Sequence, residues 1–135
     1  MLHSLNELKM ENEEAILMEE AGKVYNIRHR CFHFAKEVIE FINACQYQRI
    51  HFSIFDQLLR SATSIGANVV EGGPGSTKKD FINFFCIALK SANETKYWLC
   101  LIRDTIEVDK DKLSKLLQEA DEISKIIAAI IMSAK

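Results

Sequence analysis

The stretch Gln57–Gly72, QLLRSATSIGANVVEG, runs into the glycine-rich segment Gly72-Gly73-Pro74-Gly75, and it decides how the chain folds. At about 100° per residue, the apolar residues of this region fall on one side of a helix: Phe55, Leu58, Ala62, Ile65, Gly66 and Val69. The other side carries Arg60, Ser64, Ala67, Asn68 and Glu71. This second stripe lacks a solvating run of Lys and Glu, and it favours close contact with another protein surface.

The predicted helix spans about His51 to Glu71. Gly72 follows it at the position where a glycine commonly forms a left-handed C-terminal cap. Pro74 then prevents the helix from resuming at once, because proline lacks the backbone N–H that a helix needs. We therefore expect a left-handed Gly72 and a tight turn at this point.

Three further helices follow from the same spacing rule. They are expected from about Lys23 to Cys45, from just after Ser76 or Thr77 to about Thr105, and from near Asp109 or Asp111 onward. In the first, Phe32, Ile39 and Phe41 widen the apolar arc. Thr77 and Asp80 resemble a capping box. Four long helices with short connections predict an all-α, antiparallel up-down-up-down four-helix bundle.

The third predicted helix has two occupied faces. Phe81, Phe84, Phe85, Ala88, Ala92, Thr95, Leu99 and Ile102 form one, and Asn83, Ile87, Lys90, Glu94, Trp98 and Leu101 form the other. Large apolar groups on a back face indicate a subunit interface, and a closed homo-oligomer follows. Arg60 is expected to meet Glu94, or else Glu71, within or between subunits.

Composition separates the chain into two parts. Of its 135 residues, 48% are hydrophobic and 27% charged, which excludes a disordered protein. Residues 1–22 hold six Glu and one Lys, or −5, whereas residues 23–135 carry +3. We expect a partly ordered acidic arm over 1–22 and a bundle domain over 23–135. The body is only mildly basic, unlike a polybasic nucleic-acid binder.

The sequence offers no membrane or redox signal. The apolar run from Ile126 to Met132 is too short to span a bilayer, and the N-terminal residues do not resemble a secretory signal. The predicted location is the cytoplasm. The four cysteines, Cys31, Cys45, Cys86 and Cys100, show no CxxC spacing. They are expected to be reduced, buried thiols.

Catalytic and cofactor chemistry is not indicated. His29 and His33 are four residues apart, a spacing capable of binding metal, but no third ligand follows from the sequence, and surface or interface histidines explain the pair equally well. The glycine loop lacks the order of a P-loop and follows no strand. No catalytic arrangement of side chains stands out. We predict a protein that is not an enzyme and has no metal and no cofactor.

Two groups of cations are candidate nucleic-acid contacts. They are Arg28 and Arg30, with Lys36, on the first predicted helix, and Lys78-Lys79 at the start of the third. Ordinary solvated charge is the alternative. Tyr97-Trp98 has the chemistry to stack on bases, with packing against protein as the alternative.

Two blocks of sequence resemble a known family. QLLRSATSIGANVVEG at 57–72 and KKDFINFFCIALKSANETKYWL at 78–99 are similar to the four-helix-bundle family of bacterial 23S ribosomal RNA intervening-sequence proteins, and the tail LLQEADEISKIIAAIIMS fits its fourth helix. The likeness covers roughly residues 24–133. The family pattern corresponds to Arg60, Ser64, Ile65, Asn68, Glu71, Gly72, Lys79, Asp80, Phe81, Ala88, Ser91 and Glu94. Many members have Gly-Arg where this chain has Pro74-Gly75, which weakens the case for phosphate contact at the loop.

The resemblance implies an antiparallel bundle that assembles as a ring-like homopentamer. It also implies kinship with the accessory variability determinant of diversity-generating retroelements, a basic pentamer that works with a reverse transcriptase and nucleic acid. Two hypotheses follow. One is a non-enzymatic oligomeric scaffold that contacts RNA, a ribonucleoprotein or a nucleic-acid-processing protein. The other is a protein–protein interaction module that binds no nucleic acid.

Overall fold

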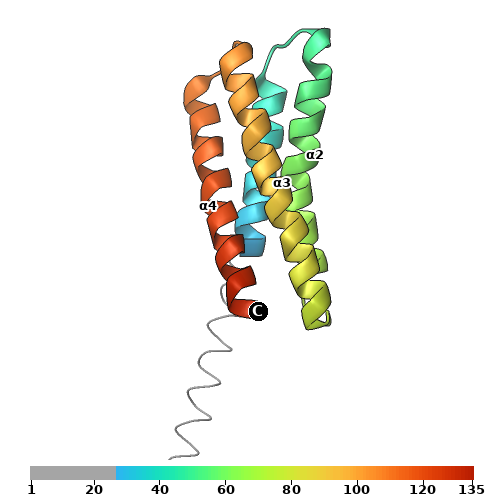
Figure 1. Cartoon of the computed structure of the whole chain (residues 1–135). Coiled ribbons are helices and arrows are strands. Elements are labelled where there is room, and N and C mark those ends of the chain that lie inside the picture. The colour runs from blue at the N-terminus through green and yellow to red at the C-terminus, as the bar shows by residue number, and fades with distance from the viewer. Residues whose placement is uncertain (1–26) are drawn as a thin grey trace, which may run out of the picture.

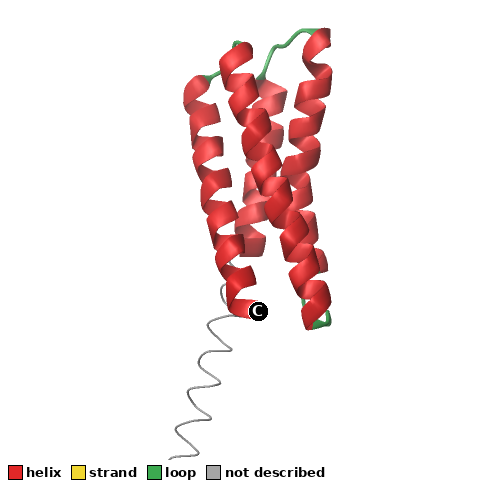
Figure 2. Ribbon diagram, viewed as in Figure 1, coloured by secondary structure: helices red, strands yellow, loops and turns green. Residues whose placement is uncertain are grey.

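Four antiparallel helices build the part of the chain described by the computed structural model, residues 27–135. The first helix covers residues 27–44, and a short 3-10 turn, η1 (Arg49–His51), leads into α2 (Phe52–Glu71). After α3 (Lys78–Thr105) comes α4 (Lys110–Ala134). Successive helices run in opposite directions (Figure 1), and only loops and turns join them (Figure 2). The predicted all-α four-helix bundle is confirmed; the predicted acidic arm lies outside the described residues.

The starts of α3 and α4 are fixed by side-chain caps. Thr77 Oγ1 accepts a hydrogen bond from the backbone N–H of Asp80 at 3.1 Å. Asp109 Oδ1 accepts one from the N–H of Lys112, also at 3.1 Å. Each cap satisfies a backbone donor that the first turn of a helix leaves without a partner. Both predicted helix starts are confirmed.

The end of α2 differs from the prediction. Gly72 is not left-handed: its φ is −78° and its ψ 15°, and the positive φ of +93° belongs to Gly75. Gly72 is buried, and a Cβ there would lie 3.1 Å from the Cβ of Phe84 and from the ring of Phe85. A side chain at this position would therefore crowd α3 where it passes the end of α2, whereas the positive φ of the turn belongs to Gly75.

The core lies on the inward stripes of all four helices. On the first helix, Phe41 is buried, but Phe32 and Ile39 are 68% and 42% exposed. Their predicted place in the buried arc is therefore wrong within the chain. The largest fully buried side chains are Phe34, Phe55, Phe85, Ile27, Leu58, Ile65, Leu99, Ile102, Leu113, Ile123, Ile127 and Val38.

The first helix packs closely on α2 at one glycine. A Cβ on Gly66 would lie 3.2 Å from the Cβ of Cys31, so the two helices approach more tightly there than larger residues allow. Burial raises the pKa of the Cys31 thiol to about 12. All four cysteines are free, as predicted, but only Cys31 is fully buried. Within residues 27–135, no helix is both long and apolar enough to cross a membrane.

Candidate interaction surface

A row of small polar side chains joins α2 to α3. Ser64 Oγ lies 2.9 Å from Ser91 Oγ, and Asn68 Nδ2 donates to the carbonyl oxygen of Ser64 at 2.8 Å. Deeper in the bundle, Thr95 Oγ1 lies 3.0 Å from Ser61 Oγ and 2.7 Å from the Ser91 carbonyl oxygen. Short neutral groups suit this position, because a buried polar group is tolerated only when it is hydrogen-bonded. We call these five residues the hydroxyl–amide row.

Several residues that were predicted to lie at a subunit interface belong to the hydroxyl–amide row and form contacts within the chain. Ser64 and Asn68 are predicted to face another protein, yet both form hydrogen bonds inside the chain, and so does Ser91. Gly72 likewise serves the α2–α3 packing. Ser61 was not singled out by the sequence reasoning. The sequence feature that could have indicated this contact is the recurrence of serine or threonine on the inward sides of α2 and α3.

Arg60 does not reach either predicted partner within the chain. Its Nε donates to Asp56 Oδ2 at 2.8 Å, and the pKa of Arg60 is raised by that hydrogen bond. Glu94 instead accepts from Trp98 Nε1 at 3.2 Å. Both Arg60 and Glu94 are exposed. The alternative in which Arg60 meets Glu94 or Glu71 within the chain is therefore wrong, and the contact between subunits stays a prediction.

The back face of α3 retains exposed side chains of mixed chemistry. We call it the outer α3 face: Asn83, Ile87, Lys90, Glu94 and Trp98. Ile87 is 44% exposed, and Trp98 is half-buried. Next to it Tyr97 is 60% exposed, and its ring packs edge-on against Trp98 with 4.9 Å between centroids. Together with Tyr97, the outer α3 face presents an aromatic pair, a branched aliphatic side chain and both signs of charge.

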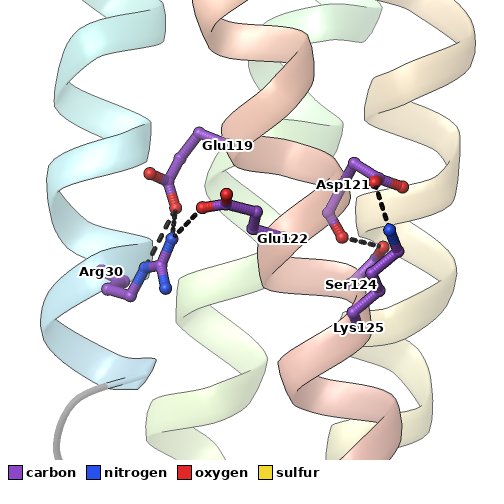
Figure 3. Close-up of polar contacts among 6 residues, drawn as sticks. All are labelled: Arg30, Glu119, Asp121, Glu122, Ser124 and Lys125. Atoms are coloured by element: carbon purple, nitrogen blue, oxygen red, sulfur yellow. Dashed lines mark hydrogen bonds and ion pairs between the residues drawn. The ribbon is translucent and has the colours of Figure 1, made fainter.

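Of the candidate nucleic-acid contacts, Arg30 is neutralised within the bundle. From the first helix it reaches two carboxylates on α4 (Figure 3): its Nε donates to Glu119 at 3.0 Å and its Nη2 to Glu122 at 2.8 Å. Burial lowers the pKa of Arg30, but the bonds to Glu119 and Glu122 outweigh that effect and raise it. A phosphate would have to compete with both carboxylates.

Arg28 packs against the α2–α3 turn. Its guanidinium occupies the space where a side chain on Gly73 would lie. Its Nε is buried and has no hydrogen-bond partner among the described residues. Lys78 and Lys79 differ from both arginines, since each is exposed in the first turn of α3 and neither forms an ion pair within residues 27–135.

A second polar cluster ties α3 to α4. Asp121 accepts from Lys125 at 2.9 Å and from Lys96 at 3.2 Å, and Lys96 also donates to Ser124 at 3.1 Å. Figure 3 shows Asp121, Ser124 and Lys125 on the side of α4 away from Arg30. The hydrogen bonds from Lys125 and Lys96 lower the pKa of Asp121. Among residues 27–135, no group of three or more His, Cys, Asp or Glu side chains is placed to hold a metal.

Comparison with known proteins identifies relatives of this bundle. The family model of the 23S rRNA-intervening sequence proteins matches residues 23–129. A crystal structure of a protein of unknown function from the S23 ribosomal protein family of Bacteroides thetaiotaomicron is 34% identical, with a TM-score of 0.75. The match covers 82% of this chain and 98% of that one. No curated protein matches the chain.

Proposed function

The chain belongs to the family of 23S rRNA-intervening sequence proteins, and we propose that it acts as a non-enzymatic, oligomeric scaffold in the cytoplasm. Its bundles assemble through the outer α3 face into a ring-like homopentamer. The assembled ring presents basic residues to RNA or to a ribonucleoprotein. The acidic arm, residues 1–22, limits that contact.

The observation that supports assembly is the division of α3 into two used faces. The inner face of α3 packs in the core and supplies part of the hydroxyl–amide row. The outer α3 face keeps Ile87 exposed, and Tyr97 is exposed next to this face, beside Trp98. Aromatic residues are enriched in the cores of protein interfaces, and Trp and Tyr are enriched among the residues that contribute most to binding energy. A second copy of the chain covers this face in the proposal.

Light scattering on the purified protein tests the assembly. A pentamer has a mass of about 77 kDa, five times the 15.4 kDa of the chain. Ile87→Asp should convert it to smaller species, because a carboxylate would be desolvated at the interface. Ile39→Asp is the matched control, since Ile39 is 42% exposed against 44% for Ile87. A monomeric wild type, or equal loss of assembly by both variants, would refute the proposed interface.

The RNA contact rests on charge and exposure. Lys78 and Lys79 are exposed and carry no ion pair within the described residues, whereas Arg30 is occupied by carboxylates. Residues 23–135 carry +3, so five copies would gather about +15 around the ring, and repeated weak contacts reinforce one another. The arm at −5 reduces the intact pentamer to about −10.

Filter binding of a structured RNA at two salt concentrations tests this contact. Removing residues 1–22 should strengthen binding, and Lys78→Glu with Lys79→Glu should weaken it, with affinity falling steeply as salt rises. Lys112→Glu with Lys115→Glu is the charge-matched control at the other end of the bundle (Figure 1). If the truncated pentamer binds no RNA at low salt, the scaffold acts on proteins instead.

A further inference from the structure

Two histidines on the exposed side of the first helix form a pair with unusual geometry. His29 Nε2 lies 3.1 Å from His33 Nε2, and their rings meet edge-on with 4.5 Å between centroids. Both side chains are exposed. The residues are one turn apart on a continuous helix, so their backbone separation is fixed by the helix itself.

The separation of the two nitrogens matches the bite of a metal ion. Imidazole nitrogens bind Zn²⁺ at about 2.0–2.1 Å. Two such bonds at angles between 90° and the tetrahedral value hold their nitrogens about 2.9–3.4 Å apart. The observed 3.1 Å lies inside that range. A metal could therefore replace the shared hydrogen bond without moving the helix.

We propose that His29 and His33 form a surface site for a divalent transition-metal ion that prefers imidazole, with Zn²⁺ as the ion to test. Each histidine contributes its Nε2 lone pair, and water fills the remaining positions. Without metal, one neutral imidazole donates its Nε2 proton to the other. On binding, that imidazole changes tautomer, its proton passing through solvent from Nε2 to Nδ1, so that both Nε2 atoms face the metal.

The charges around the pair set the expected strength. Arg30 nearby is neutralised by Glu119 and Glu122, which reduces its repulsion of a cation. Lys36 is exposed one turn beyond His33 and opposes binding. With two protein ligands, the site binds weakly compared with a structural zinc centre, which has four. The open positions leave room for a ligand from another molecule. The inference does not depend on the proposed assembly.

Calorimetric titration of the intact protein with Zn²⁺ near pH 7.5 tests the site. We expect one Zn²⁺ per chain for this pair. His33→Ala should lower the affinity at least about 10-fold, because even the loss of a group that only supports a ligand costs about 10–100-fold. His3→Ala, which removes a histidine far along the sequence, should leave this binding in place.

A spacing variant separates the metal site from a general effect of histidine number. His33→Ala combined with Glu37→His keeps the histidine count but places the two imidazoles eight residues apart, about 12 Å along the helix. This variant should bind as weakly as His33→Ala. Wild-type affinity in either variant would overturn the proposal, as would a wild type that binds no Zn²⁺ more tightly than about 1 mM.

Discussion

Two of the helix–helix contacts that carry polar side chains, here called seams, are built from opposite chemistries. Between α2 and α3 the contacts come from short, neutral side chains, and Thr95 among them is fully buried. Between the first helix and α4 they come from Arg30 with Glu119 and Glu122, side chains that are 35%, 32% and 51% exposed. The first seam is internal and the second faces water.

This difference follows from the cost of removing charge from water. A buried ion pair loses more hydration than its mutual attraction returns unless every group is satisfied. A buried hydroxyl needs only one or two partners, which a neighbouring helix can supply. The chain therefore places neutral groups where α3 is enclosed and charges where water still reaches them. The two seams should respond differently to mutation and to salt.

The largest effect is expected in the α2–α3 seam. Thr95→Val keeps the side-chain shape but removes the hydroxyl beside Ser61 Oγ. It should lower the free energy of unfolding by about 1–3 kcal/mol, the cost of weakening a buried hydrogen-bond arrangement. Urea denaturation measures this. Thr63→Val is the control, because among residues 27–135 Thr63 bonds only to carbonyls of its own helix, and its effect should stay within about 0.5 kcal/mol. Equal effects would mean that the row contributes no special stability.

A smaller effect is expected in the seam between the first helix and α4. Arg30→Met should lower the free energy of unfolding by about 0–1 kcal/mol, because exposed ion pairs contribute little. The loss should shrink further at about 1 M salt, where the screening length falls to about 3 Å. Arg103→Met serves as the control, since within the described part of the chain Arg103 pairs only with its neighbour Asp104. A loss comparable to that of Thr95→Val would contradict the contrast between the seams.

The smallest effect concerns pH at the α3–α4 cluster. The pKa of Asp121 is lowered by Lys125 and Lys96 from its ordinary value of 3.8. A lowered folded-state pKa adds stability above the unfolded value and loses it as pH falls through the folded one. Asp121→Asn should therefore differ from wild type at pH 6 and converge with it as pH falls well below 3.8. Thermal melts across this range measure the convergence. A constant difference would show that the carboxylate's charge is not involved.

The sequence predicts the helices because their determinants are local. Thr77, Asp80 and Asp109 act within one turn of themselves, so their capping roles could be read from spacing. Gly72 shows the limit of that reasoning. Its position suggested a left-handed cap, but its actual requirement is space beside Phe84 and Phe85, which only the packed structure reveals.

The polar contacts between helices were less predictable. Arg60 pairs with Asp56, one turn earlier on the same helix, so this contact follows from a local spacing that the sequence shows. The expectation of Glu94 as its partner depended instead on the register of α2 against α3, which hydrophobic spacing does not specify. The pairing of Arg30 with α4 joins side chains that are partly exposed, and the spacing of the buried residues does not specify such pairs. The distance between the Nε2 atoms of His29 and His33 depends on the side-chain rotamers of the two residues. Spacing alone indicated only that the two rings share a face.

The pairing of Arg30 with Glu119 also bears on how the chain folds. These residues are 89 positions apart in sequence, whereas α2 and α3, and then α3 and α4, are helical hairpins closed by short turns. Local pairings form fast, and helical bundles of this kind fold in microseconds to milliseconds. The contact of the first helix with α4 joins the segments that are farthest apart in the sequence, and the ion pairs of Arg30 contribute little energy to it. Arg30 should therefore have a φ-value near zero, its contact forming after the rate-limiting step and affecting unfolding alone.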